Sequence, residues 1–189
     1  MMTVGFDEAG RGPLAGPVCA AAVILPDDFP VEILNDSKKL SEKKRAAAEL
    51  VIKEKAVWGI ALVDHKKIDE IYILEASMLA MKLAFEDMMK KLKVSGDVEM
   101  SEISGITDGT RCPDIPIECH CEPKADGKYP CVMAASILAK TCRDRLMLEM
   151  DKKYPEYGYA KHKGYPTKAH REICHKLGPS PIQRLTFKY

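Results

Sequence analysis

A glycine- and proline-rich link between two apolar runs is the feature that most restricts how this chain can fold. Residues 3–6 and 18–25 are largely apolar, and the nine residues 9–17 include three glycines and two prolines. This pattern predicts two strands joined by a loop of unusual backbone conformation, because glycine adopts dihedral angles that other residues avoid. The first strand leads directly into Asp7 and Glu8, so two adjacent acids are expected at its end.

Helices and further strands alternate along the rest of the chain. The predicted helices cover residues 42–55, 69–92, 131–153 and 168–176, and the predicted further strands cover residues 57–63, 98–107 and 115–119. Ser41 is the expected N-cap of the first helix. In the third helix, Lys140, Arg143 and Arg145 are expected to line a polar side. The order of elements predicts an α/β layered domain in which helices cover a mixed sheet.

The chain length and the distribution of charge describe the domain further. A length of 189 residues predicts a single domain, with a core over about residues 1–150 and a C-terminal extension over about 151–189. Residues 1–129 carry 17 basic and 23 acidic side chains, whereas residues 130–189 carry 12 basic and five acidic side chains. A basic C-terminal third on an acidic body predicts a surface that faces a polyanion.

Composition also limits the compartment. The sequence has no apolar run long enough to span a membrane, and its N-terminus lacks the basic region of a signal peptide. Seven cysteines are an odd number in a chain too large to depend on disulfides. We therefore expect a cytoplasmic protein with reduced thiols and no membrane partner.

Acidic side chains at strand ends are the candidate catalytic groups. Asp108 ends a predicted strand, and Asp126 lies in a loop before the long helix. If the strands ending at Asp7 and Asp108 are neighbours, three or four carboxylates meet at one sheet edge. Carboxylates without histidine or cysteine suit Mg²⁺ or Mn²⁺, and two such ions could stabilise both oxygens of a phosphodiester displacement. Ordinary turn chemistry is the alternative reading of each Asp-Gly pair.

The end of the first strand and the Gly-Arg-Gly stretch after it each allow two interpretations. Consecutive strand residues point to opposite faces, so Asp7 and Glu8 could serve one site only if the strand is irregular there, and the glycine-rich link could supply that break. The sequence of residues 10–12, Gly-Arg-Gly, is either a tight turn with a surface arginine or a backbone without side chains that a nucleic-acid strand can approach.

Taken together, these stretches resemble ribonuclease HII, the type 2 ribonuclease H family, and its bacterial single-chain branch in particular. The resemblance is carried, in the family's order, by GFDEAGRGPLAGPV (5–18), LNDSKKLS (34–41), DG (108–109), KAD (124–126), AASILAK (134–140), KHKGYPT (161–167) and GPSPI (178–182). It covers essentially the whole chain. Ala125 departs from the family, where glycine commonly precedes the last aspartate, and Met133 stands where a small residue is common.

The resemblance implies a fold and an activity. The fold is a ribonuclease H-like mixed five-stranded sheet flanked by helices, with a small basic C-terminal helical extension. The activity is endonucleolytic hydrolysis of RNA–DNA hybrids and of duplex DNA containing ribonucleotides, on the 5′ side of a ribonucleotide, with two Mg²⁺ or Mn²⁺ ions and with 3′-hydroxyl and 5′-phosphate products. We expect a monomer. Residues 185–189 match a sliding-clamp peptide too loosely to support a clamp partner.

The resemblance also assigns roles to residues. The catalytic, metal-binding carboxylates would be Asp7, Glu8, Asp108 and Asp126. The substrate-binding residues would be Gly10, Arg11, Gly12, Ser37, Lys38, Ser136, Lys140 and Tyr165. Among these, the Gly-Arg-Gly backbone would contact the ribonucleotide 2′-hydroxyl and flanking phosphates. Tyr165 would stack on the following sugar, and the serines and lysines would contact phosphates.

Two other classes of function are weighed against this enzyme. A non-catalytic module could bind hybrid duplexes through the basic C-terminal third, although retained acids repel a phosphate backbone unless a metal intervenes. A zinc protein could use Cys112, Cys119, His120 and Cys121, but this run lacks the spacing of structural zinc ligands. A catalytic triad has no support beyond the presence of Ser, His and Asp.

Overall fold

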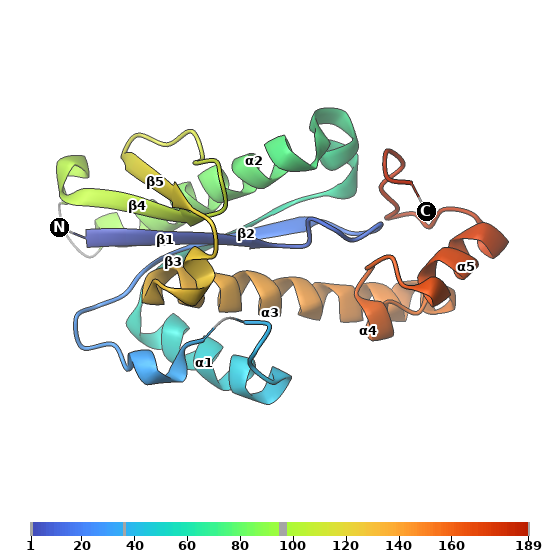
Figure 1. Cartoon of the computed structure of the whole chain (residues 1–189), viewed down its shortest axis with the longest axis horizontal. Helices are drawn as coiled ribbons and strands as arrows, with labels where there is room; N and C mark the ends of the chain where they lie inside the picture. The colour runs from blue at the N-terminus through green and yellow to red at the C-terminus, as the bar shows by residue number, and fades with distance from the viewer. Residues whose placement is uncertain (1, 36, 95–97, 189) are drawn as a thin grey trace.

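A five-stranded mixed sheet forms the centre of this computed structural model, which describes residues 2–35, 37–94 and 98–188 (Figure 1). The strands are β1 (Met2–Ala9), β2 (Val18–Ile24), β3 (Val57–Val63), β4 (Ile103–Asp108) and β5 (Glu118–Glu122). Their order across the sheet is β3-β2-β1-β4-β5. Strand β2 is antiparallel to both β1 and β3, whereas β4 is parallel to β1 and β5 is parallel to β4. The mixed sheet expected from the sequence is confirmed.

Helices cover both faces of this sheet. They are α1 (Glu42–Lys55), α2 (His65–Val94), α3 (Pro130–Lys153), α4 (Tyr159–His162) and α5 (Lys168–Leu177). Short 3-10 turns lie at Val31–Ile33, Met100–Glu102, Ala125–Gly127 and Pro155–Tyr157. Figure 1 shows α2 on one side of the sheet and α1 and α3 on the other, with α4 and α5 beyond one end. No helix in the described part of the chain is long and apolar enough to cross a membrane.

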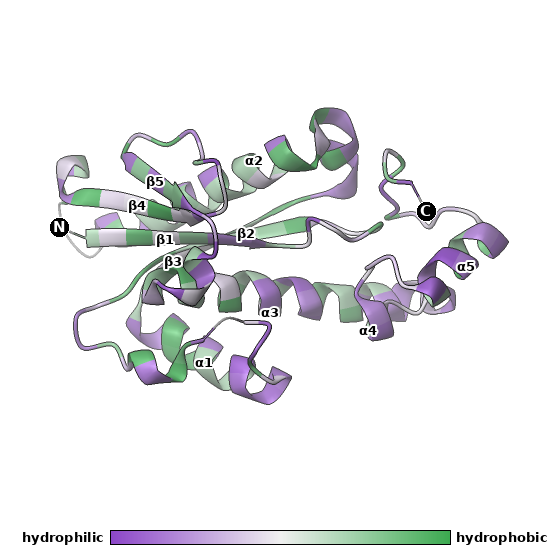
Figure 2. Cartoon of the chain, viewed as in Figure 1, coloured by the Kyte–Doolittle hydropathy of each residue, from purple (hydrophilic) through white to green (hydrophobic). Residues whose placement is uncertain are grey.

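Alternation along β2 builds a core on each face. Ala20 and Ala22 face the α2 side, where they form one buried cluster with Met81 and Met88. The intervening residues of β2 pack with α1 and α3 on the opposite side. Because every residue of β2 is buried, its run of small apolar side chains is that of a central strand covered on both faces. Figure 2 shows hydrophobic residues along this strand and hydrophilic ones along α4 and α5.

Some element boundaries differ from the sequence prediction. The strand predicted over residues 98–107 begins only at Ile103, because a 3-10 turn occupies the residues before it. The strand predicted over 115–119 is also displaced, since β5 covers Glu118–Glu122 and Ile115 packs against the α2 core. The second helix begins at His65 rather than at residue 69, and Tyr72 interrupts it with a non-helical backbone.

Glycine allows a very close approach between β1 and α3. A Cβ atom on Gly5 would lie 2.2 Å from the carbonyl carbon of Cys131 and 2.4 Å from the amide nitrogen of Val132. Both neighbours are backbone atoms in the first turn of α3, so they cannot move aside as a flexible side chain would. The close contact places the start of α3 directly over the middle of β1.

Replacing Gly5 by alanine should therefore destabilise the fold. We expect Gly5→Ala to lower the free energy of unfolding by about 3 kcal/mol, because the added methyl group overpacks a rigid contact. Gly127→Ala is the matched control, since a Cβ there has no neighbour within 4 Å, and its effect should stay within about 1 kcal/mol. Urea unfolding followed by circular dichroism measures both. Equal stability of the two variants would contradict the packing argument.

Candidate active site

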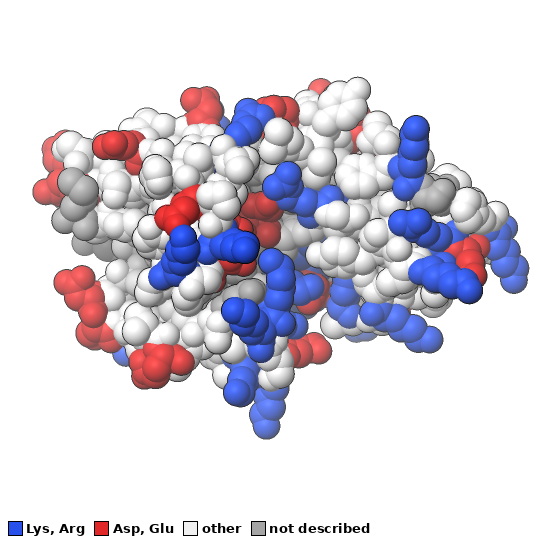
Figure 3. Space-filling model, viewed as in Figure 1, with Lys and Arg blue, Asp and Glu red and all other residues white. Residues whose placement is uncertain are grey.

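A pocket of about 430 Å³ opens where β1 and β4 end. Its lining consists of Asp7, Glu8, Ala9, Gly10, Arg11, Gly12, Ser37, Lys38, Asp108, Ser136, Lys140 and Tyr165. All the residues predicted for the site line this pocket except Asp126, whose carboxylate lies 3.6 Å from the Lys38 ammonium. In the space-filling view, Lys and Arg side chains surround acidic side chains near the middle of the face shown (Figure 3).

Strand pairing brings the first two aspartates to the same edge. The parallel register of β1 and β4 pairs Phe6 with Thr107, and Asp7 and Asp108 are the next residue in each strand. The two strands are therefore neighbours, as the sequence analysis required for the carboxylates to converge. The Asp108 carboxylate also accepts a hydrogen bond from the Ala125 amide at 2.8 Å, which connects β4 to the turn that carries Asp126.

The premise that Asp7 and Glu8 could serve one site only if β1 were irregular is wrong. The strand continues through Ala9, and Asp7 and Glu8 pair with Ala21 and Ala20 of β2 in regular register. Both acids still line the pocket because β1 extends beyond its ladder with β4, which leaves an open rim. A regular strand that extends beyond the end of its neighbour is sufficient to present consecutive side chains to one site.

Burial and mutual repulsion raise the pKa values of the two acids in β1. Burial raises the pKa of Asp7 well above its ordinary value, and the neighbouring charges of Glu8 and Asp108 act in the same direction. The pKa of Glu8 is also raised by burial, against the opposing effect of Arg11 at 3.4 Å. A hydrogen bond from Ser136 partly offsets the rise at Asp7. The acids thus meet in a partly buried pocket that also holds Arg11, Lys38 and Lys140.

The carboxylates of the pocket are suitable ligands for divalent cations, but they are not already arranged around a metal position. Within residues 2–35, 37–94 and 98–188, no three Asp, Glu, His or Cys side chains are arranged so that they could already hold a metal ion. The groups at the rim are nevertheless carboxylates, which hard cations prefer, and burial raises the pKa values of Asp7 and Glu8 because their negative charge is costly there. A cation bound between them would relieve that charge.

Ala125 does not strain the loop before Asp126. The left-handed backbone in this turn falls on Lys124, with φ of 65°, while Ala125 begins the 3-10 turn and is buried. Ala125 itself therefore needs no backbone conformation that favours glycine, and Asp126 remains beside the pocket.

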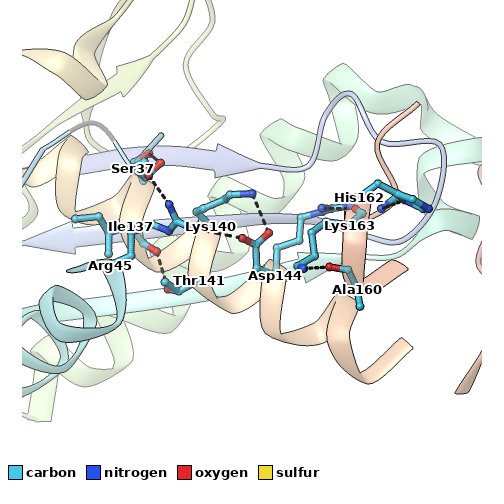
Figure 4. A network of polar contacts seen from close by, with 12 residues as sticks. Ser37, Arg45, Ile137, Lys140, Thr141, Asp144, Ala160, His162 and Lys163 are labelled. Atoms are coloured by element: carbon cyan, nitrogen blue, oxygen red, sulfur yellow. Dashed lines mark hydrogen bonds and ion pairs between the residues drawn. The ribbon is translucent and has the colours of Figure 1, made fainter. Parts of the chain in front are cut away.

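A polar network holds the serines and lysine on the other wall. The hydroxyl groups of Ser37 and Ser136 lie 2.8 Å apart and are both buried. Figure 4 shows Arg45 donating to the Ser37 carbonyl at 2.9 Å, while Lys140 donates to Asp144 at 2.8 Å. Arg45 also lies 3.9 Å from Asp144, so one carboxylate joins α1 to α3 under the pocket wall. Sequence reasoning missed Arg45, which resembles any other charge on a solvated helix.

Sequence reasoning misplaced Arg143 and missed Arg184, and both are large, fully buried side chains. Arg143 was predicted on a polar helix side, but it is 1% exposed, and Arg184 is 0% exposed. Both guanidinium groups donate to carbonyl oxygens of the loop between β1 and β2. The only signal for Arg143 was its position between the buried residues Ala139 and Met147.

Comparison with known proteins agrees with the resemblance seen in the sequence. The sequence model of the family described as Ribonuclease HII matches residues 4–189. The chain is 48% identical to a ribonuclease HII from Dechloromonas aromatica and 50% identical to one from Treponema denticola. Each comparison covers 98% of this chain, and they cover 90% and 98% of those proteins respectively.

Solved structures give the same result at lower sequence identity. The ribonuclease HII of a PCNA complex from Archaeoglobus fulgidus has a TM-score of 0.76 at 25% identity, covering 100% of this chain and 96% of that one. Ribonuclease H2 from Pyrococcus horikoshii has a TM-score of 0.75 at 26% identity, covering 100% and 94%. The expected ribonuclease H-like sheet is confirmed, and the chain belongs to the ribonuclease HII family, whose members are ribonuclease H enzymes.

Proposed function

We propose that this ribonuclease H cuts the RNA strand of RNA–DNA hybrids and cuts on the 5′ side of ribonucleotides embedded in duplex DNA. The products would carry 3′-hydroxyl and 5′-phosphate ends. The observation that carries the proposal is the composition of one pocket, which combines strand-end carboxylates with the backbone of residues 10–12 and the ring of Tyr165. Carboxylates suit a phosphodiester hydrolysis that depends on metal ions, and an exposed backbone suits the recognition of a sugar.

The proposed cofactors are two Mg²⁺ or Mn²⁺ ions. Asp7, Glu8, Asp108 and Asp126 would hold them. When bound, the ions would activate a water molecule and stabilise the leaving 3′-oxygen. For their part, the carboxylates would ionise more readily beside the cations, because opposite charge offsets the burial and the repulsion that raise the pKa values of Asp7 and Glu8. A polyanionic substrate could then approach an acidic rim.

The other wall of the pocket would recognise the ribonucleotide and its flanking phosphates. Gly12 lies against Tyr165, with 3.8 Å between the position of a Cβ atom and the ring carbon Cε1. The Lys140 ammonium lies 5.7 Å from the centre of the same ring. This arrangement offers an aromatic face for a sugar and a cation for an adjacent phosphate. Ser37, Lys38 and Ser136 are the further proposed phosphate contacts at this wall.

Mapping the cut in a labelled duplex that contains one ribonucleotide tests the activity. With Mg²⁺ or Mn²⁺ we expect a single cut on the 5′ side of the ribonucleotide, and with EDTA we expect none. Binding that persists without any cleavage under all three conditions would instead favour the non-catalytic hybrid-binding module.

Removal of the Asp7 or the Asp108 carboxylate should greatly lower turnover without unfolding the protein. We expect Asp7→Asn and Asp108→Asn each to lower the cleavage rate by about two orders of magnitude or more. Because the pKa of Asp7 is raised in the folded state, its charge opposes folding increasingly as the pH rises above the ordinary carboxyl value. Asparagine removes that opposition, so the thermal midpoint of Asp7→Asn should not fall at neutral pH.

Asp114→Asn is the control for these two variants. Asp114 is an exposed aspartate paired with Lys82 outside the pocket, and its replacement should leave turnover unchanged. Near-normal turnover of Asp7→Asn or Asp108→Asn would refute their assignment to the site.

Gly10 and Gly12, on either side of Arg11, should respond differently to replacement by alanine. Gly12 lacks a left-handed φ and has only an ordinary contact with Tyr165, so Gly12→Ala should change stability by no more than about 1 kcal/mol. Its methyl group would nevertheless occupy the pocket and should lower kcat/KM by about tenfold or more. Gly10 has φ of 97° and a Cβ would stand 2.1 Å from Arg143 Nε, so Gly10→Ala should lose stability as well. Full activity of folded Gly12→Ala would count against a substrate role for this backbone.

Tyr165 should matter most where a single ribonucleotide must be recognised. We expect Tyr165→Ala to lower kcat/KM on a duplex with one ribonucleotide by about tenfold or more, and to impair cleavage of long hybrids less. Long hybrids offer alternative registers that do not all need the stacked ring. Tyr165→Phe keeps the ring and is expected to retain most activity. An equal loss on both substrates would reduce the tyrosine to a general binding role.

A further inference from the structure

Two buried arginines hold the loop that follows β1. Arg184 comes from the C-terminal segment and Arg143 from α3, and both are almost completely inaccessible to solvent. In the described part of the chain, neither guanidinium forms an ion pair with a carboxylate within 4 Å, and their hydrogen bonds go to backbone carbonyls. Buried arginine is uncommon and costly, so a full set of acceptors is needed to retain it.

Arg184 bonds to both sides of the glycine-rich loop. Its Nη2 donates to the Gly10 carbonyl at 2.6 Å, and its Nη1 donates to the Arg11 carbonyl at 3.0 Å. Its Nε donates to the Gly16 carbonyl at 2.9 Å, farther along the same loop. A single planar guanidinium thus fixes two consecutive peptide groups and ties them to the returning chain.

Arg143 connects this loop to the segment that carries Tyr165. Its Nε donates to the Pro17 carbonyl at 2.9 Å and its Nη2 to the Ala15 carbonyl at 3.2 Å. Its Nη1 donates to the Lys163 carbonyl at 3.0 Å, two residues before Tyr165. The two walls of the pocket are therefore held by one side chain.

The carbonyl directions determine where the amide groups point. The described chain has no cis peptide bond, and in a trans peptide the C=O of one residue and the N–H of the next point in opposite directions. Because the Gly10 and Arg11 carbonyls point at Arg184, the amide hydrogens of Arg11 and Gly12 point away from it. Residues 10–12 line the pocket, so this orientation makes backbone donors available on the substrate side of the loop.

The C-terminal segment is itself anchored at several points. Arg184 donates its own backbone N–H to the Leu14 carbonyl at 2.8 Å, and the Gly16 amide donates to the Ile182 carbonyl at 2.9 Å. On the other side, the Asp69 carboxylate of α2 accepts from the Leu185 and Thr186 amides at 2.8 and 2.9 Å. The guanidinium of Arg184 is thus held firmly enough to position what it binds.

We propose that Arg184, assisted by Arg143, is a positioning residue that orients the backbone amides of Arg11 and Gly12 and so sets the selectivity for a ribonucleotide. The proposal rests on the proposed function, because it assumes that these amides meet the substrate. The C-terminal segment would then contribute to substrate recognition in two ways, through its basic surface and through an arginine that binds the loop carbonyls.

Enzyme kinetics on matched duplexes tests the functional half of this proposal. Arg184→Gln should raise KM for a duplex with one ribonucleotide by about tenfold, as expected for the loss of one or two substrate hydrogen bonds. The inhibition constant of an all-DNA duplex of the same sequence, used as a competitor, should rise by a clearly smaller factor, because that duplex keeps the phosphates but has no 2′-hydroxyl at the site. A purely structural role would instead lower kcat and the thermal midpoint without separating the two duplexes.

Hydrogen exchange tests the structural half without any substrate. In Arg184→Gln we expect faster amide exchange in peptides covering residues 10–17 and unchanged exchange in peptides covering β2, because the loop loses three of its anchoring donors. Arg145→Gln is the matched control, since Arg145 pairs with the Glu49 carboxylate at 2.8 Å and touches no part of this loop. It should leave KM and loop exchange at wild-type values.

Asp69→Asn provides a second variant if Arg184→Gln does not fold. It leaves both arginines in place and weakens only the anchor of residues 185–186, so it should shift KM and loop exchange in the same direction by a smaller factor. An unchanged KM in folded Arg184→Gln, or an equal rise in KM and in the all-DNA inhibition constant, would overturn the proposal. Failure of the wild-type protein to cut at a ribonucleotide would refute the proposed function instead, and the exchange result would still decide whether Arg184 orders the loop.

Discussion

The parallel pairing of β1 with β4 is the contact on which the site depends. It aligns Phe6 with Thr107, so that Asp7 and Asp108 follow at the same rim of the sheet. The absence of a side chain at Gly5 lets α3 lie against β1, and Ser136 then meets the Asp7 carboxylate. Negative charge is thereby collected where solvent reaches it poorly, and burial with mutual repulsion raises the pKa values of the acids in β1. Such a concentration of charge is tolerable in a site that attracts cations.

A second constraint acts on the backbone of the loop after β1. This loop has few side chains of its own that could fix it, and its carbonyl groups are satisfied by donors that come from α3 and from the C-terminal segment. Buried carbonyls need partners, and arginine can serve several at once because its donors lie in one plane. The segment beyond α3 therefore does more than add basic surface, since it also completes the hydrogen bonding of the loop between β1 and β2.

The sequence analysis located most elements well because their patterns are strong. The central strand β2 and the helix after Ser41 agree with the predicted ranges closely, as an uninterrupted apolar run and a capped helix should. The boundaries of β4 and β5 were wrong because apolar residues such as Ile115 can be buried equally well against a helix or in a ladder. The premise that Asp7 and Glu8 need an irregular strand to share a site was also wrong, since strand alternation does not reveal where a neighbouring strand stops. Arg143 was misplaced because periodicity treats every arginine as a solvated residue.

By itself, the sequence determined the order of strands and helices, the family, and the identity of the residues that gather in the pocket. Those properties follow from local patterns and contiguous motifs, which depend only on residues that are neighbours in the sequence. Only the tertiary structure decided that the acids of β1 share a rim without a break in the strand, and that two arginines are buried beneath the glycine-rich loop. The bond from Arg184 to Gly10 joins residues 174 positions apart. Contacts at such separations leave no periodic signal, because they depend on how whole elements pack against one another.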